Sequence, residues 1–513
     1  QLPLYRAPSL DWALSGQNGI RFNRDDAFRR ISRSFHAVKD SEYTPPASLQ
    51  KVLRKYQRDG YRWLRTLDGY GMGGILADDM GLGKTVQVLS YLLAMKQNGQ
   101  TLPSLIVCPA SLVLNWAEEC QKFTPELSCV VVDGDAAHRA ELAESWPAAD
   151  LVVTSYDLLR RDEALYEGQE FYACILDEAQ AIKNHTTQKY KAVCKVRSRV
   201  RFALTGTPVE NRLGELWSIF SFLMPGYLPP YKSFCSRFEK PIVQEEDQTA
   251  VRRLNQLTGP FILRRMKADV LKELPPKTEN VYRIELEEEQ HKLYLAAVVD
   301  AREKLQAAKP EDKMAVFAVL MRLREICCDP RLIADNWEGG SAKLDACAEL
   351  VSSAVEGGHR ILLFSQFTSM LELLAKRLDA EGISHFTLQG STPKPVRAEL
   401  VRRFNGGEVS VFLISLRAGG TGLNLTAADI VIHYDPWWNV AAQNQATDRA
   451  YRIGQQNPVQ VYKLIAQDTI EEKIVELQQA KQSLADTVTG TADGAILSMR
   501  PDELLQLLEG SEP

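Results

Sequence analysis

Short apolar runs recur along two stretches of the chain, and each run is closed by polar or glycine-rich residues and followed by a helical pattern. Runs rich in Val and Ile that do not alternate with polar residues predict buried parallel strands with helices packed on both faces. We therefore predict an α/β protein with two doubly wound lobes. The runs are residues 74–77, 104–108, 151–155, 173–177 and 202–206, then 360–364, 385–388, 409–414, 430–433 and 459–462.

Between the two stretches the pattern changes. Pro and aromatic residues at 225–231 give way to long charged helical patterns such as residues 287–309. We predict a helical insertion and linker between the lobes. The predicted division is 1–45 as the tail of a preceding module or an N-terminal extension, 46–225 as lobe 1, 226–340 as the insertion, 341–475 as lobe 2, and 476–513 as bracing helices.

Composition narrows the class of protein. The 513 residues predict three or four units, and 45% apolar with 25% charged residues is ordinary globular composition. Lys and Arg number 61 against 66 Asp and Glu, a net charge of −5, which excludes a uniformly basic nucleic-acid coat but allows a local basic groove. The chain starts at Gln1 rather than Met, which suggests a fragment of a longer protein or a processed end.

The nine cysteines are scattered, and the one close pair, Cys327 and Cys328, is adjacent rather than spaced as a zinc or redox motif. Scattered cysteines in an odd number are typical of reduced thiols in a cytosolic compartment. Apolar runs such as residues 409–416 are far too short to cross a bilayer. We expect no membrane partner.

Residues 78–85, Asp-Asp-Met-Gly-Leu-Gly-Lys-Thr, stand between the run at 74–77 and a helical pattern at 86–95. In this order of strand, loop and helix, backbone N–H groups can close around phosphate oxygens at a helix N-terminus. Lys84 would reach the β- and γ-phosphates and Thr85 would ligate Mg²⁺. The strict pattern has Gly where Asp78 stands, so a glycine-rich turn with a surface lysine is the alternative. The nucleotide-binding residues predicted from this loop are Asp79, Met80, Gly81, Leu82, Gly83, Lys84, Thr85 and Val86.

A second acidic motif, Asp-Glu-Ala-Gln at 177–180, ends the apolar run at 173–177. At the carboxyl end of a strand, Asp177 can hold the Mg²⁺ shell while Glu178 polarises the attacking water. An isolated Asp-Glu pair is more often a solvated helix start. The phosphate loop upstream favours the catalytic interpretation.

Together with these two motifs, residues 204–211, 415–424, 435–439 and 445–455 resemble the ordered motifs of the SWI2/SNF2 ATPases of helicase superfamily 2. The resemblance extends over about residues 45–485, and residues 264–277 resemble a stretch that separates this family from ordinary helicases. It implies two tandem RecA-like lobes, ATP and Mg²⁺ as cofactors, and translocation along double-stranded DNA without strand separation. Eukaryotic remodelers usually carry Asp-Glu-Gly-His at 177–180, so Gln180 indicates a prokaryotic member.

The resemblance also assigns residues outside these loops. Gln57 would read the adenine, although its surroundings also fit a plain amphipathic helix. Gly422, in the 415–424 motif, would lie at the nucleotide. Arg449 and Arg452 would be arginine fingers, and their spacing from Gln445 puts all three on one face of a helix. Surface arginines paired with Asp448 or with solvent are the alternative.

Superfamily enzymes track the DNA backbone across both lobes, and polar loops fall at the corresponding places, although plain strand-end loops would look the same. Residues 189–201 carry six basic side chains and no acidic one, and residues 264–277 have a net charge of +3. Either stretch could touch DNA, but a solvated face or a brace between the lobes is equally compatible. Trp437 and Trp438 are expected to pack in the core rather than stack on bases. The predicted nucleic-acid contacts are Asn115, Trp116, Thr154, Ser155, Gln366, Ser415 and Arg417.

We therefore predict an ATP-dependent double-stranded DNA translocase that remodels or displaces DNA-bound proteins, acts as a monomer, and lies in the cytoplasm of a prokaryote or the nucleus of a eukaryote. A strand-separating DNA or RNA helicase is the alternative enzyme. A non-catalytic, nucleotide-responsive scaffold is disfavoured because every expected catalytic position is filled. The catalytic residues predicted are Lys84, Glu178, Arg449 and Arg452.

Overall fold

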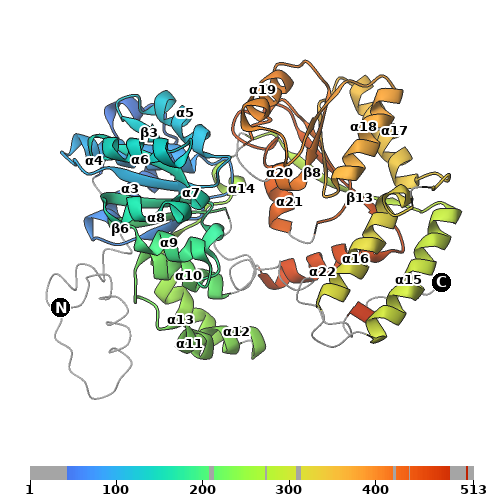
Figure 1. Ribbon diagram of the computed structural model, residues 1–513, viewed down its shortest axis with the longest axis horizontal. Helices are drawn as coiled ribbons and strands as arrows, with labels where there is room; N and C mark the ends of the chain where they lie inside the picture. Colours follow the sequence, from blue (N-terminus) through green and yellow to red (C-terminus); the bar gives the residue numbers. More distant parts are fainter. Residues whose placement is uncertain are drawn as a thin grey trace. The chain divides into compact units, whose positions relative to one another are not determined.

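The computed structural model describes residues 43–206, 213–245, 247–271, 274–307, 313–334, 336–419, 423–437, 440–485 and 504–505. The chain divides into two compact units, the first ending at Lys272 and the second beginning at Glu273. Each unit is built on a parallel β-sheet with helices on its faces (Figure 1). The predicted α/β class with two doubly wound lobes is confirmed.

The first unit has a seven-stranded sheet in the order β3-β4-β2-β5-β6-β1-β7, and every pairing is parallel. Strands β2 and β4 are buried along their whole length, as expected for runs of Val, Ile and Leu covered on both faces. The strands are β1 (Gly74–Leu76), β2 (Ser104–Cys108), β3 (Cys129–Val131), β4 (Leu151–Ser155), β5 (Glu170–Asp177), β6 (Arg197–Leu204) and β7 (Ile262–Leu263).

Helices of this unit cover the sheet and continue into a helical subdomain formed by α10 to α13 (Figure 1). The α-helices are α3 (Lys55–Gly69), α4 (Lys84–Gln97), α5 (Val113–Phe123), α6 (Ala136–Ser145), α7 (Tyr156–Arg161), α8 (Glu163–Glu167), α9 (Gln188–Lys195), α10 (Leu213–Leu223), α11 (Tyr231–Phe234), α12 (Lys240–Gln244), α13 (Gln248–Thr258) and α14 (Lys267–Val270).

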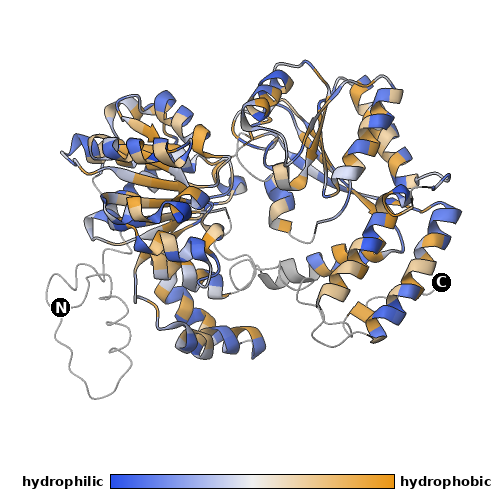
Figure 2. Cartoon of the chain, in the orientation of Figure 1, coloured by the Kyte–Doolittle hydropathy of each residue, from blue (hydrophilic) through white to orange (hydrophobic). Residues whose placement is uncertain are grey.

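The second unit has a six-stranded parallel sheet in the order β10-β11-β9-β12-β13-β8. Its strands are β8 (Lys277–Ile284), β9 (Ile361–Ser365), β10 (His385–Leu388), β11 (Val411–Ser415), β12 (Ile430–His433) and β13 (Val459–Ala466). Its helices are α15 (Glu288–Ala307), α16 (Lys313–Cys328), α17 (Ala342–Glu356), α18 (Thr368–Ala380), α19 (Lys394–Asn405), α20 (Leu416–Gly419), α21 (Val440–Thr447) and α22 (Ile470–Ala485). Figure 2 shows apolar residues concentrated in the sheets of both units.

All ten predicted strands are present, but three others were missed. The half-buried β3 and the two-residue β7 are too short to give a pattern, and β8 is exposed at all but two positions. The last two lie in the predicted helical insertion, 226–340, which is therefore not purely helical. It supplies one edge strand to each sheet, and the division between the units falls inside it, at 272/273.

All nine cysteines are free thiols. Among the helices of the described residues, none is both long and apolar enough to span a lipid bilayer. Trp437 packs against the apolar core of the second unit, which confirms the core-packing prediction for this residue. Trp438 lies outside the described residues.

Candidate functional site

The loop at 78–85 leaves β1 and enters α4, as predicted. Gly81 and Gly83 both have positive φ angles, 79° and 75°, which turn the chain tightly enough to aim successive N–H groups into one cradle. A Cβ atom on Gly83 would lie 2.5 Å from Nε2 of Gln57, so a larger residue here would displace the Gln57 amide from the loop. Helix α4 begins at Lys84 and places its N-terminus at the loop.

Lys84 and Gln57 both contact this loop. The Lys84 ammonium donates to the carbonyl of Asp78 at 2.7 Å, and a second contact to the carbonyl of Asp79 is 3.4 Å long. Gln57, on α3, donates through Nε2 to the carbonyl of Leu82 at 3.0 Å. The structure therefore brings the predicted adenine-reading residue against the predicted phosphate loop, although α3 is also the amphipathic helix that the sequence pattern allows.

Asp177 ends β5 and is held from three sides. The indole N–H of Trp116 donates to its Oδ2 at 2.9 Å, the backbone N–H of Glu178 donates to its Oδ1 at 2.9 Å, and the Tyr156 hydroxyl donates to its carbonyl at 2.9 Å. Burial, and then the charge of Glu178, raise the pKa of Asp177 to about 7. Glu178 itself has a φ of 49°, a left-handed conformation that is costly for a residue other than glycine and is found preferentially at functional sites.

The register of the sheet puts the two motifs at the same level. Leu76, the last residue of β1, and Asp177, the last of β5, both pair with Leu204 of β6, which lies between them. Two strand spacings separate the strands, roughly 10 Å, and this suits a loop and a carboxylate that share one bound phosphate chain. The parallel sheet brings the motifs together although 92 residues or more separate them in the sequence (177 − 85 = 92).

Gln180 links the acidic motif to the next strand. Its Nε2 donates to Glu178 Oε2 at 2.7 Å, and its Oε1 accepts from the Thr205 hydroxyl at 3.0 Å. Thr205 directly follows β6 and opens the 204–211 motif, of which residues 207–211 lie outside the described part of the chain. Gln180 therefore joins Glu178 to the end of β6.

The donor set suits Mg²⁺ in a nucleotide complex rather than a metal held by protein alone. In the described residues no group of three or more His, Cys, Asp or Glu side chains could hold a metal ion. Mg²⁺ usually takes one or two protein oxygens together with substrate phosphates and water. Thr85 at the start of α4 and the half-buried Asp177 carboxylate, whose raised pKa a cation would oppose, fit that requirement.

In the second unit, the structure corrects the helical placement of the arginines. Helix α21 ends at Thr447, so Arg449 and Arg452 lie in the turns that follow and not on one face with Gln445. The N–H of Arg449 donates to the carbonyl of Ala446, three residues earlier, at 3.1 Å. In an α-helix it would donate to the carbonyl four residues earlier. Arg449 is 2% exposed, whereas Arg452 is half-buried.

Arg452 lies beside the 415–424 motif. One of its guanidinium nitrogens, Nη1, lies 3.4 Å from the carbonyl of Leu423. Gly422, the motif residue predicted at the nucleotide, is next in sequence to Leu423 but lies outside the described residues. The structure therefore places Arg452 next to the described end of this motif, within the second unit.

The predicted nucleic-acid residues of the first unit differ in accessibility. Trp116, Thr154 and Ser155 are 1%, 0% and 3% exposed, so their side chains offer no surface to a ligand. Each has a structural partner instead: Asp177 for Trp116, the Tyr166 hydroxyl for Thr154, and the N–H of Leu158 for Ser155. Asn115 is half-exposed and bonds Glu119 Oε1 at 3.2 Å.

The second-unit candidates are also partly engaged. Gln366 accepts a hydrogen bond from Arg324 at 2.7 Å, and Ser415, the last residue of β11, is 4% exposed. The backbone of Arg417 lies in α20. Arg324 itself is a buried residue of α16 that also bonds the Asp435 carboxylate at 2.9 Å, and no sequence signal distinguished it.

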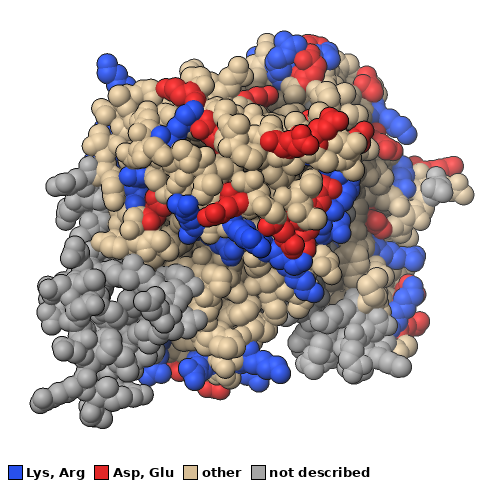
Figure 3. Space-filling model, turned by 60° about the vertical axis from the view of Figure 1, so that its left-hand side comes forward, with Lys and Arg blue, Asp and Glu red and all other residues tan. Residues whose placement is uncertain are grey.

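Three of the six basic residues in the stretch 189–201, namely Lys189, Lys195 and Arg199, are paired with acids. Lys189 contacts Asp157 at 3.1 Å and Lys195 contacts Glu167 at 3.1 Å. Figure 3 shows blue and red side chains interspersed over much of the face that it presents, with a band of blue side chains across its middle. The arrangement is typical of a solvated face with mixed charge.

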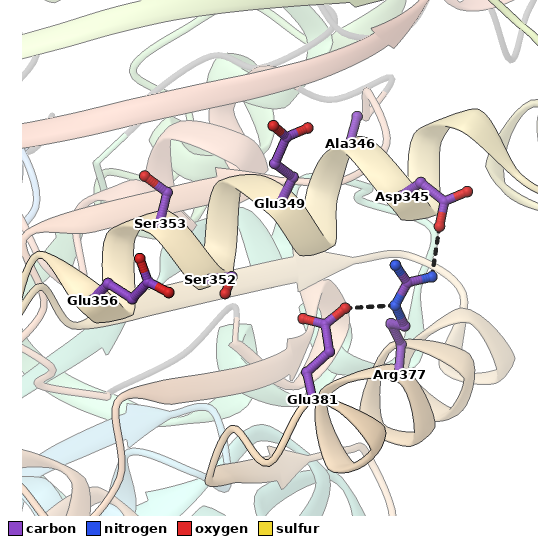
Figure 4. Close-up of a pocket in the computed structure, with 8 residues that line it drawn as sticks. All are labelled: Asp345, Ala346, Glu349, Ser352, Ser353, Glu356, Arg377 and Glu381. Atoms are coloured by element: carbon purple, nitrogen blue, oxygen red, sulfur yellow. Dashed lines mark hydrogen bonds and ion pairs between the residues drawn. The ribbon is translucent and has the colours of Figure 1, made fainter.

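A groove of about 640 Å³ between α17 and α18 is acidic (Figure 4). Arg377 bridges Asp345 and Glu381 at 2.5 and 2.6 Å, and Glu349 and Glu356 line the same groove. Because four carboxylates face one guanidinium, this groove does not suit a phosphate backbone.

Comparison with known proteins gives the family. A model described as SNF2-related domain matches residues 56–332, more than half of the chain, and a model described as helicase conserved C-terminal domain matches residues 342–454. These two matches cover the predicted nucleotide motifs of the first unit, the 415–424 motif and all but the last residue of the 445–455 motif.

Relatives come from bacteria and eukaryotes. An uncharacterized ATP-dependent helicase of Mycoplasma genitalium is 40% identical over 463 residues, 89% of this chain and 44% of the relative. YwqA of Bacillus subtilis, described as a candidate ATP-dependent helicase/translocase, is 39% identical over 501 residues, 95% of this chain and 54% of the relative. Human TATA-binding protein-associated factor 172 is 36% identical over 546 residues, 91% of this chain and 30% of the relative. The chain thus spans about half the length of these bacterial relatives.

Among solved structures, the SWI2/SNF2 ATPase core of Sulfolobus solfataricus in complex with dsDNA is 36% identical, with a TM-score of 0.44, over 89% of this chain and 97% of that chain. The family assignment rests on the family models, on the ordered motifs and on the two parallel-sheet units that carry them. The chain belongs to the SNF2-related family of superfamily 2 ATPases.

Proposed function

We propose that the chain is an ATP-hydrolysing motor that translocates along double-stranded DNA and displaces or remodels DNA-bound proteins without separating the strands. The observation that carries this proposal is one edge of the first sheet, where the glycine loop with Lys84 follows β1 and the Asp177–Glu178 pair stands at the end of β5. These two strands lie on either side of β6 and end at the same level. The second unit contributes the motif that carries Arg452, beside Leu423.

In this proposal each residue of the first unit has one task at the nucleotide. Gln57 reads the adenine, the loop amides and Lys84 hold the phosphates, and Thr85 and Asp177 hold Mg²⁺, which neutralises charge on the phosphate oxygens. Glu178 orients and deprotonates the attacking water. Its hydrogen bond from Gln180 keeps the carboxylate in place and links it to Thr205 at the end of the next strand.

The second unit supplies positive charge to the transferred phosphate. We assign Arg452, and with it Arg449, to this role by family resemblance, because guanidinium groups stabilise the charge that develops on phosphoryl oxygens. Since the phosphates bind one unit and the arginines belong to the other, ATP favours closure of the two units and hydrolysis removes that preference. Repeated closing and opening then steps the motor along its track.

Contacts to DNA are proposed at the strand-end loops of both units, through Asn115, Gln366 and the 415–417 segment, and through backbone N–H groups near them. Because such contacts neutralise phosphates without reading bases, affinity should fall steeply as salt rises. Trp116, Thr154, Ser155 and Ser415 are not proposed as side-chain contacts because they are buried, so Ser415 would contribute only through its backbone N–H.

A DNA-bound protein is the proposed cargo, and a monomer the proposed working state. The name of the human relative connects it with the TATA-binding protein, and the name of YwqA includes translocase. The Mycoplasma relative is named only as a helicase, which favours the strand-separating alternative.

The decisive experiment measures ATPase rates with duplex DNA, single-stranded DNA and RNA at matched salt, together with unwinding of a forked duplex and displacement of a triplex-forming strand. We expect duplex DNA to stimulate hydrolysis most, with triplex displacement and no unwinding. Robust fork unwinding would make the chain a helicase. No stimulated ATPase at all would leave only a nucleotide-responsive scaffold.

A further inference from the structure

Asp78 stands where the strict phosphate-loop pattern has glycine, and the structure gives this carboxylate a specific partner. Asp78 is 0% exposed, and Arg265 binds it with both arms of the guanidinium: Nε lies 2.8 Å from Oδ1, and Nη2 contacts Oδ2. Arg265 comes from the 264–277 stretch, 187 residues further along the chain. A bidentate pair of this kind fixes both position and orientation.

The same guanidinium joins two further elements of the site. Its Nη2 donates to Gln87 Oε1 on α4 at 2.8 Å, and its Nη1 donates to the carbonyl of Tyr56 on α3. Gln87 in turn donates to Asp78 Oδ2 at 3.1 Å and to the carbonyl of Gly83 at 3.2 Å. Arg265 therefore links the start of the loop, its end and the helix that carries Gln57.

Backbone bonds extend this contact along the loop. The N–H of Ala77 donates to the carbonyl of Leu263 at 2.7 Å, and the N–H of Asp79 donates to the carbonyl of Arg265 at 3.0 Å. The N–H of Lys267 donates to Asp79 Oδ2 at 2.9 Å. Residues 263–267 thus form one wall of the phosphate loop, and a few residues later, at Lys272, the chain leaves the first unit.

The chemistry of Lys84 explains why this wall matters. Its ammonium now donates to the carbonyl of Asp78, but the same ammonium is required by the β- and γ-phosphates when nucleotide binds. The loop then loses that donor and must keep its shape by other contacts. Arg265 bonds the side chain of Asp78, whereas Lys84 bonds its backbone carbonyl. The bonds of Arg265 therefore remain when Lys84 binds the phosphates.

We propose that Arg265 is a positioning residue of the nucleotide site. It holds the phosphate loop in its binding shape and makes that shape depend on residues 263–267, the segment that leads to the second unit. This role rests on the proposed function in one respect: a two-unit motor needs the binding of nucleotide in the loop to affect the segment that leads to the second unit. What it predicts directly is that Arg265 raises the affinity for nucleotide, and this affinity can be measured without DNA.

The test compares three variants of the full chain with the parent. In Arg265→Lys a single ammonium group replaces the planar guanidinium, which bonds Asp78, Gln87 and Tyr56 at the same time. In the double variant Asp78→Asn/Arg265→Gln, both buried charges are removed together, so the unpaired charge that makes a single truncation destabilising never arises. Arg253→Ala, an exposed arginine of α13, is the control.

Three quantities are measured: the Kd for ADP carrying a fluorescent methylanthraniloyl group, the thermal unfolding midpoint, and hydrogen–deuterium exchange of the peptide 262–271 with and without ADP. We expect ADP to slow exchange in the parent and in Arg253→Ala. In Arg265→Lys, ADP should bind about 10-fold more weakly, a value typical for loss of a supporting contact, and should no longer slow exchange. The double variant should unfold near the parent temperature yet bind ADP as weakly as Arg265→Lys.

Parent-like affinity and exchange in the double variant would overturn the proposal, because Arg265 would then only neutralise a buried acid. If the double variant does not fold, Arg265→Lys decides alone, and parent-like ADP affinity in it overturns the proposal. Failure of DNA to stimulate ATP hydrolysis in the parent would instead refute the proposed motor, while leaving the ADP measurements interpretable.

Discussion

The indole N–H of Trp116 donates to the carboxylate of Asp177 across 2.9 Å. Trp116 is a residue of α5 that the sequence suggested for DNA contact, yet it is buried and its indole N–H bonds the predicted magnesium ligand. One end of α5 therefore carries the half-exposed Asn115 and, next to it, a hydrogen-bond donor to the predicted magnesium ligand. The orientation of Asp177 depends on the packing of that helix.

Replacement of Trp116 by Phe keeps most of the buried volume and removes this donor. A partner that orients a metal ligand is typically worth about 10- to 100-fold in metal affinity or activity. We expect the Mg²⁺ concentration for half-maximal ATPase to rise about 10-fold on this basis. Trp217→Phe, whose indole bonds the carbonyl of Pro229, is the matched control, and an unchanged Mg²⁺ requirement in Trp116→Phe would contradict the proposed role.

Lys84→Ala removes the cation expected at the β- and γ-phosphates. We expect DNA-stimulated hydrolysis to be nearly abolished, while binding to duplex DNA at low salt persists, because the proposed DNA contacts lie in other loops. Steady-state ATPase and a DNA-binding titration check this. Substantial turnover by Lys84→Ala would mean that the loop at 78–85 is not the phosphate site.

Arg452→Ala tests the contribution of the second unit. By analogy with other arginine fingers, we expect hydrolysis to fall by about 10³-fold or more. Arg402→Ala is the control, because this arginine of α19 is 76% exposed and pairs with Glu399 of the same helix. Near-normal turnover in Arg452→Ala would remove the closure mechanism, and the same assay on Arg449→Ala would show whether the more buried arginine takes part.

Lys343 of α17 and Glu471 of α22 form a fully buried ion pair, with the Nζ and Oε2 atoms 2.5 Å apart. Lys343→Met leaves the carboxylate buried without its cation, and such a change typically costs about 3–5 kcal/mol. The double variant Lys343→Met/Glu471→Met removes both charges, so most of the lost stability should return. Thermal unfolding of the parent, Lys343→Met and the double variant checks this, and a double variant as unstable as Lys343→Met would show that the pair itself stabilises the fold.

His433 predicts a pH dependence of stability. Burial first, and then the charge of Lys463, lower its pKa to about 3, from an ordinary value of 6.5. The folded state keeps His433 neutral, so unfolding takes up a proton below pH 6.5. Stability from this residue is therefore complete above that pH and is lost as the pH falls toward 3.

The expected slope is about 1.4 kcal/mol per pH unit for one proton, or about 2 kcal/mol between pH 6.5 and pH 5. His433→Gln should flatten the profile of chemical unfolding over that range. His138→Gln, at a side chain that is 52% exposed, should leave it unchanged. Equal profiles for the parent and His433→Gln would show that the histidine is protonated in the folded state.

Much of the site could be predicted from the sequence because its signals are local. Gly81 and Gly83, followed by Lys84 and Thr85 at a helix start, predict the shape of the loop from a few consecutive residues. The Asp177–Glu178 pair stands at the end of a buried strand, which predicts its place at the edge of the sheet. The motif assigns Arg449 and Arg452 as arginine fingers, which stays a prediction, but their placement on one helical face with Gln445 was wrong. Periodicity alone did not show that α21 ends at Thr447, where three-residue bonds replace the helical ones.

What the sequence determined by itself is the set of elements and the chemistry at their ends, since apolar runs, glycines and charged residues act on their immediate neighbours. Only the tertiary structure decided which distant groups share a bond: Trp116 with Asp177, Arg265 with Asp78, Lys343 with Glu471. Buried polar groups must find partners, and the order of strands in the sheet determines which side chains lie close enough to provide them. The sequence contains every hydrogen-bond donor and acceptor, but it does not say which donor bonds which acceptor.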